Sequence, residues 1–153
     1  MTRKELGMQR FLDGYNCAQC MILAFEDLID IDVNLALKIA SPFGGGMGRL
    51  REVCGSVSGM FIVLGYLRGY SDPDDYEAKK RIYEEVQELA HRFEEDNGSI
   101  ICRDLLGLTE KRQDATPEKR TEEYYKKRPC AEKVGSAIEI LEAYFKELEI
   151  LPL

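Results

Sequence analysis

Five cysteines are the residues of this 153-residue chain that are best suited to chemistry. Cys17 and Cys20 form a Cys-x-x-Cys pair, a spacing that dithiol redox sites use. Cys54, Cys102 and Cys130 follow one at a time. The thiolate form of cysteine attacks disulfides and binds metals, so these residues indicate either thiol–disulfide exchange or a metal site. An odd number of cysteines cannot all pair within one chain.

Four of the cysteines share a position in the predicted secondary structure, in or near the first turn of a helix: Cys17, Cys54, Cys102 and Cys130. Unpaired backbone N–H groups and the helix dipole favour negative charge there, so we expect these thiols to ionise more easily than usual. Arg49 and Arg51 flank Cys54, and Arg128 lies two residues before Cys130. Each arginine is expected to favour the thiolate in the same way.

Helices are predicted along the whole chain, because no segment alternates with strand period for long. Asn16 is predicted to cap a helix that runs to about Ile29. The most apolar helix is expected to begin at Arg51 or Glu52 and to reach about Gly69, in the middle of a bundle.

The other predicted helices have start or stop signals of their own. They are a short helix within 1–12, one capped by Asp32 that ends before Pro42, one opened by Asp72-Pro73-Asp74-Asp75 and stopped by Asn97-Gly98, a short piece at 102–106, a surface helix opened by Thr116-Pro117 within the charged stretch 109–128, and a last helix from about Pro129. The fold class is therefore all-α: a single domain over 1–153, a helical bundle of about five to seven helices with a Gly-rich loop before a central buried helix.

The Gly-rich loop precedes the most apolar helix, with four glycines between residues 44 and 48. Glycine reaches backbone angles closed to other residues, so the loop is predicted to be a tight connection that lets the backbone approach Cys54 closely. A second interpretation is an anion cradle of backbone N–H groups, although the ending of a P-loop is missing. The residues expected to support the cysteine site are Gly45, Gly46, Gly48, Arg49, Gly55 and Gly59.

Composition excludes several classes of function. The net charge of −7 argues against a nucleic-acid-binding surface, which needs a concentrated basic patch. The longest apolar run, 57–67, is too short to span a bilayer, and no signal peptide precedes it, so we expect a cytoplasmic protein without membrane insertion. His91 lies off the apolar stripe of its helix and is predicted to be exposed, which disfavours a Cys–His catalytic pair.

The motifs GYNCAQ at 14–19, FGGGMG at 43–48, VCGSVSG at 53–59, CRDLLG at 102–107 and Cys130 occur in one order along the chain. Together they resemble the family of redox-active proteins that is named for its C_GCAxxG_C_C cysteine pattern. The resemblance covers about 10–145 and implies that Cys17, Cys54, Cys102 and Cys130 are the family's site cysteines. Ser56 stands where the CGAxxG motif has alanine. The resemblance supplies no substrate.

Cys20 has no counterpart in that pattern and is interpreted as a residue of the core. No strand precedes the Cys-x-x-Cys pair, which argues against a thioredoxin-like site. We therefore expect a thiol–disulfide exchange protein, which would be a thiol–disulfide oxidoreductase if it turns over, with Cys17 and Cys54 as the exchanging pair and an unidentified redox partner.

Two alternatives remain open. No cofactor is predicted for the exchange reaction, but the same four thiolates would be the right number for a metal ion or an iron–sulfur cluster, despite their wide separation in sequence. In the other alternative the protein is a non-catalytic helical accessory protein. Its cysteines would then only pack, and its apolar helices would serve core formation or the assembly of a homo-oligomer.

Overall fold

A computed structural model of the chain describes residues 1–110 and 112–153. The described residues form one all-α domain, as the sequence predicts. Six of its helices have eight or more residues: α1 (Arg3–Leu12), α2 (Cys17–Ala24), α3 (Val33–Ala40), α5 (Gly55–Arg68), α6 (Tyr76–Asn97) and α9 (Cys130–Glu147). The shorter elements are α4 (Gly44–Met47), α7 (Cys102–Leu105), α8 (Glu122–Lys127) and the 3-10 turns η1 (Glu26–Leu28) and η2 (Ser41–Phe43).

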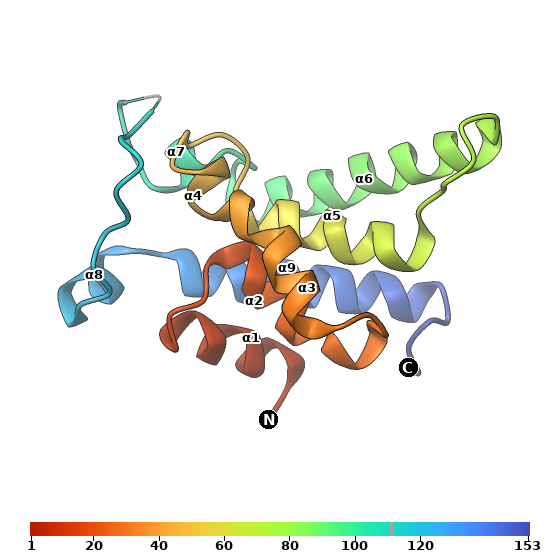
Figure 1. Cartoon of the computed structure of the whole chain (residues 1–153), viewed down its shortest axis with the longest axis horizontal. Coiled ribbons are helices and arrows are strands. Elements are labelled where there is room, and N and C mark those ends of the chain that lie inside the picture. Colours follow the sequence, from red (N-terminus) through yellow and green to blue (C-terminus); the bar gives the residue numbers. More distant parts are fainter. Residues whose placement is uncertain (111) are drawn as a thin grey trace.

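Helix α2 lies in the middle of the bundle and packs against α1, α3, α5 and α9 (Figure 1). Its sequence explains this position, because every residue except Gln19 is apolar and buried. Helix α5 is buried along its first half, as expected for a central helix. Helices α6 and α9 instead have one buried face each, in keeping with their polar outer surfaces.

Two glycines let α5 approach α2 closely. A Cβ atom on Gly55 would lie 3.0 Å from the Cβ of Cys17, and one on Gly59 would lie 2.8 Å from the carbonyl oxygen of Ala18. Side chains at these positions would push the two helices apart. The glycine spacing of one helical turn therefore sets the distance between α5 and the start of α2, where Cys17 lies.

Capping residues fix most of the helix boundaries. The side chain of Asn16 accepts a hydrogen bond from the Gln19 N–H, Asp32 does the same for Leu35, and Gly98 ends α6 in a left-handed conformation. These three boundaries confirm the sequence prediction. None of the described helices has the length and apolar character that a transmembrane span requires.

Two predicted helices have different bounds in the structure. Helix α2 ends at Ala24 and gives way to the turn η1, rather than reaching Ile29. Helix α5 begins at Gly55 instead of residue 51 or 52, because the residues before it form a turn and a β-bridge.

The predicted surface helix at Thr116-Pro117 is absent from the described residues, and α8 begins at Glu122. Asp114 accepts a hydrogen bond from the Thr116 N–H in a local turn, and the Gln113 N–H donates to the carbonyl of Arg49. These bonds give the backbone partners outside a helix.

Candidate functional site

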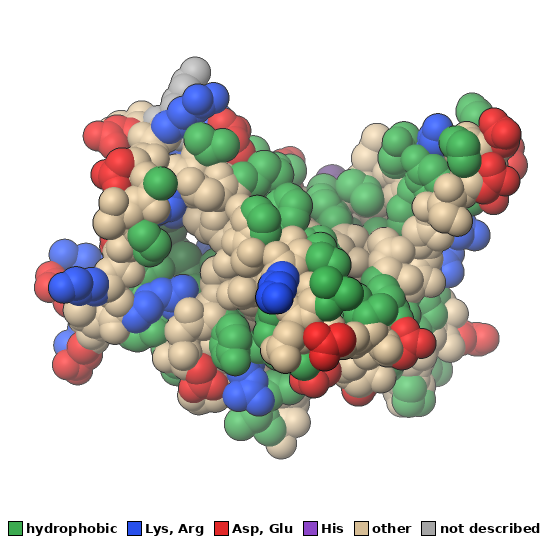
Figure 2. Space-filling model, viewed as in Figure 1, with side chains coloured by type: hydrophobic (Ala, Val, Ile, Leu, Met, Phe, Trp, Pro, Cys, Tyr) green, Lys and Arg blue, Asp and Glu red, His purple; other side chains and the backbone are tan. Residues whose placement is uncertain are grey.

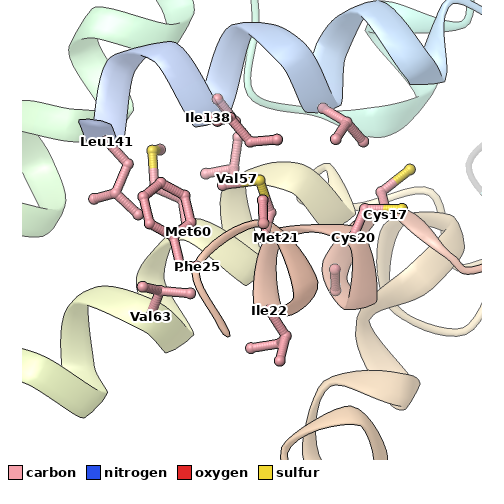
Figure 3. Packing of buried hydrophobic residues seen from close by; sticks show 14 of the residues in the cluster. Cys17, Cys20, Met21, Ile22, Phe25, Val57, Met60, Val63, Ile138 and Leu141 are labelled. Carbon is pink, nitrogen blue, oxygen red and sulfur yellow. The ribbon is translucent and has the colours of Figure 1, made fainter. Parts of the chain in front are cut away.

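The four cysteines predicted to form the site line one pocket at one end of the bundle. Cys17, Cys102 and Cys130 are the first residues of α2, α7 and α9, and Cys54 is the N-cap of α5. Figure 3 shows Cys17 at one end of the buried cluster, opposite Leu141 and Val63. The tertiary structure thus brings together four helix starts that lie far apart in the sequence.

Cys54 and Cys102 are held side by side by backbone hydrogen bonds. Val53 and Ile101 form an isolated antiparallel bridge. On either side of it, the N–H of Cys54 donates to the carbonyl of Ile100 at 2.8 Å, and the N–H of Cys102 donates to the carbonyl of Glu52 at 2.5 Å. This bridge aligns the start of α5 with the start of α7.

The glycine-rich segment forms a left-handed turn rather than an open loop. Five consecutive residues have positive φ: Gly45 (67°), Gly46 (65°), Met47 (71°), Gly48 (60°) and Arg49 (67°). L-residues other than glycine rarely adopt this conformation, which explains why glycine occupies three of the five positions. A Cβ atom on Gly46 would lie 2.6 Å from the Cβ of Cys102, so the turn packs directly on the site.

Cys17 and Cys130 lie in one pocket, and their ionisations are linked. Hydrogen bonding to Cys130 is the largest cause that raises the pKa of Cys17 well above its usual value, and burial acts in the same direction. The same bond lowers the pKa of Cys130 to about 7, with further help from Arg128, Arg51 and Arg120 against the effect of burial. Of the two thiols, Cys130 is therefore the one whose surroundings favour the thiolate.

The other thiols favour the protonated form. Burial raises the pKa of Cys54 to about 11 and that of Cys20 to about 12. Burial also raises the pKa of Cys102, although Arg51 opposes it by donating from Nη1 to Sγ at 3.5 Å. The expectation that all four helix-start thiols ionise easily is thus wrong for three of them. Desolvation outweighs the favourable position at Cys54 and Cys102, and at Cys17 the bond with Cys130 and burial both raise the pKa.

The pocket has a volume of about 60 Å³, enough for a few water molecules or a small substituent. It is too small to enclose a nucleotide cofactor. Phe11, Tyr124 and Pro129 form apolar parts of its wall. The pocket can therefore admit the reacting end of a ligand while the rest stays outside.

The arrangement does not provide the geometry of a metal site. Within residues 1–110 and 112–153, no three or more His, Cys, Asp or Glu side chains are placed together to hold a metal ion. The four thiols line one pocket as two sets, Cys17 with Cys130 and Cys54 with Cys102. The metal or cluster alternative therefore gains no support from the geometry and remains a prediction for native mass measurement.

Comparison with protein-family models gives one result. The model described as "Putative redox-active protein (C_GCAxxG_C_C)" matches residues 15–144, which include the four pocket cysteines. The chain belongs to the C_GCAxxG_C_C family. The search of the curated proteins and the search of the solved structures each found no match.

In this C_GCAxxG_C_C protein, the serine that replaces alanine in the CGAxxG motif is a residue of the core. Ser56 is fully buried, and its Oγ has no hydrogen-bond partner among the described residues. The backbone of Ser56 acts to lower the pKa of Cys54, although burial of the thiol outweighs it. The described lining of the pocket does not include Ser56.

The supporting residues of this family member have separate roles. Gly45, Gly46 and Gly55 line the pocket, and Gly59 lies deeper in the α2–α5 contact. Arg49 binds the 113–114 segment: its Nε donates to the carbonyl of Asp114 at 2.8 Å. It thereby anchors the 113–118 segment to the left-handed turn.

Sequence analysis did not place Arg120, Tyr124 or Lys133 at the site, yet all three line the pocket. Arg120 and Tyr124 belong to the charged stretch that was predicted to be a solvated surface helix. The guanidinium of Arg120 instead lies 4.3 Å from the ring centre of Phe11 and 5.1 Å from that of Tyr124. The aromatic residues inside the charged run were the only signal that this segment packs against the bundle.

The lowered pKa of Cys130 predicts how this C_GCAxxG_C_C protein reacts with an alkylating agent. One thiol is expected to react first, with a rate that rises as pH increases and has its midpoint near pH 7. The Arg128→Gln variant should move that midpoint upward, because it removes a positive charge that favours the thiolate. Timed iodoacetamide labelling with peptide mapping measures both. A first-labelled residue other than Cys130, or a midpoint above pH 9, would contradict this assignment.

Proposed function

We propose that the protein carries out thiol–disulfide exchange, with Cys130 as the attacking thiol and Cys17 as the resolving thiol. The observation that carries this proposal is that both thiols line one pocket, where the pKa of Cys130 is lowered and that of Cys17 is raised. Cys130 is also the most exposed of the five cysteines, and it lines the pocket. Nucleophilicity and access therefore coincide at the same sulfur atom.

The reaction proceeds in two displacements. The Cys130 thiolate attacks one sulfur of a disulfide, so that a Cys130–substrate bond forms and a thiolate leaves. Cys17 then loses its proton to that leaving group or to water and attacks the Cys130 sulfur. The products are a Cys17–Cys130 disulfide and two substrate thiols, and two electrons have passed from the protein to the substrate. An external dithiol is needed to reduce the protein again.

The first displacement prepares the second. While Cys130 is a thiolate, it holds the Cys17 proton through their hydrogen bond. When Cys130 becomes part of a mixed disulfide, that negative charge is gone and the largest cause of the raised Cys17 pKa disappears. Cys17 consequently becomes easier to ionise at the moment when it has to attack.

The sequence alone favoured Cys17 and Cys54 as the exchanging pair. The geometry favours Cys130 as the partner of Cys17, because Cys54 is buried and its pKa is raised to about 11. Cys54 and Cys102 form a second pair of neighbours across the β-bridge. In this proposal Cys54 and Cys102 do not attack the substrate, but they can exchange with the Cys17–Cys130 disulfide after it has formed.

Disulfide mapping tests the proposal. The protein is purified anaerobically, reduced, freed of reductant and treated with one equivalent of 2-hydroxyethyl disulfide, and its native and peptide masses are then measured. We expect a loss of about two daltons and a bridge between Cys17 and Cys130. A Cys17–Cys20 bridge, or no reaction at all, would overturn the proposal.

The same spectra separate the alternatives. A first bridge between Cys17 and Cys54 would keep the exchange reaction and reject the assignment of Cys130. An excess native mass that is lost on acid unfolding would support the metal or cluster alternative. A protein that neither oxidises nor carries additional mass would be the helical accessory protein whose cysteines only pack.

A further inference from the structure

Three cations of the pocket have no carboxylate partner. Arg51, Arg120 and Lys133 line the pocket, and none of them forms an ion pair among the described residues. No Asp or Glu lines this pocket in the described part of the chain. The protein as a whole carries a net charge of −7, so this local excess of positive charge runs against its composition.

Neutral groups hold the three cations in place. Arg120 donates to the carbonyl oxygens of Phe11 and Tyr15 at 3.0 and 3.2 Å. Arg51 donates from Nε to Gln113 Oε1 at 2.9 Å, and Lys133 donates from Nζ to Asn97 Oδ1 at 3.1 Å. These contacts fix the positions of the charged groups without neutralising them. The positive charge of the three side chains can therefore interact with a ligand in the pocket.

A second, more open pocket adjoins the first. It also contains Asn16, Gly45, Arg51, Arg120 and Tyr124, but no cysteine. Its volume of about 330 Å³ is several times that of the pocket that the cysteines line. On the face drawn in Figure 2, the surface is hollowed where the segment before α8 arches away from the bundle.

This second pocket, called the outer pocket below, has one acidic residue in its described lining, Glu118. That carboxylate is paired with Arg128 and lies 3.9 Å from Arg49, so it does not neutralise Arg51 or Arg120. Arg51 and Arg120 therefore line both the narrow pocket that contains the cysteines and the wider outer pocket, which opens to solvent.

We propose that the substrate is a small organic disulfide whose two halves carry carboxylates. The inference rests on the exchange function proposed above and names the substrate class for the same site. The reacting sulfur enters the narrow pocket that contains the cysteines, and the rest of the molecule occupies the outer pocket. Arg51, Arg120 and Lys133 attract the anion and stabilise the additional negative charge of the thiolate that leaves when Cys130 forms its bond.

Size-matched disulfides of different charge test this inference. Reduced protein, freed of reductant, is mixed under anaerobic conditions with 3,3′-dithiodipropionate, 2-hydroxyethyl disulfide or cystamine. The loss of protein thiols gives a single-turnover rate constant for each compound. Dividing each by its rate with free 2-mercaptoethanol removes the intrinsic reactivity of the disulfide. We expect the anionic compound to react at least about tenfold faster than the neutral one and cystamine to react slowest, with differences that shrink as salt is added.

A charge variant provides the matched comparison. Lys133→Gln should lower the ratio of the anionic to the neutral rate about fivefold, whereas Lys146→Gln, at the far end of α9, should leave the ratio as it is. Equal normalised rates for the three compounds would overturn the charge inference while leaving exchange intact. Failure of all three to oxidise the protein would instead overturn the exchange function.

Discussion

The Cys17→Ser variant is expected to trap its substrate as a stable mixed disulfide on Cys130. Cys130 would still attack, because Arg128, Arg51 and Arg120 continue to favour its thiolate. No resolving thiol would then displace the substrate. Intact mass measurement after reaction with 2-hydroxyethyl disulfide should show the protein plus one half of the reagent.

The reciprocal variant should lose the first step. In Cys130→Ser, burial still raises the pKa values of Cys20, Cys54 and Cys102, and it still raises that of Cys17 although the Cys130 thiolate is gone. Their thiolate fraction at pH 7 should be well below that of Cys130, so the rate of the first displacement should fall at least about tenfold.

Cys20→Ala serves as the control for both variants. Cys20 is completely buried, and the described lining of the pocket does not include it. Its removal should cost some stability and leave the site's reactivity in place. If Cys17→Ser resolved its mixed disulfide as fast as the unchanged protein, Cys17 would not be the resolving thiol.

The Gly46→Ala substitution is expected to cause the largest loss of stability near the site. Its φ of 65° costs an L-residue about 1–2 kcal/mol. The new Cβ would also lie 2.8 Å from the Cα of Arg51 and 2.9 Å from the backbone nitrogen of Glu52, where the backbone has to shift. Overpacking of this kind adds about 1–3 kcal/mol, so the free energy of unfolding should fall by about 2–5 kcal/mol.

Gly48→Ala separates the two contributions. Gly48 has a similar φ of 60°, but a Cβ there would meet no atom within 4 Å. Its cost should therefore be limited to the backbone conformation, about 1–2 kcal/mol. Chemical denaturation of both variants measures the difference. Equal losses for the two substitutions would mean that the close packing of the turn on Cys102 does not contribute to stability.

Local signals in the sequence determined the helical elements. Asn16, Asp32 and Gly98 act within a few residues of themselves, so the boundaries that they set could be predicted without knowledge of the fold. The same holds for the position of the four cysteines at helix starts. Where the signal depended on distant partners, the prediction was wrong: Thr116-Pro117 opens no helix in the described residues, because Arg49 binds the neighbouring backbone.

Tertiary structure alone decided which thiols meet and which one ionises. Cys17 and Cys130 are 113 positions apart and come together because α2 and α9 pack in one bundle. A helix start favours a thiolate in every case, but burial opposes it to a different extent at each cysteine. At Cys130 the bond with Cys17 and the charges of Arg128, Arg51 and Arg120, which come from separate segments, together outweigh burial and lower the pKa. Desolvation and charge–charge interactions both depend on distances across the fold. The spacing of residues along the chain does not determine those distances.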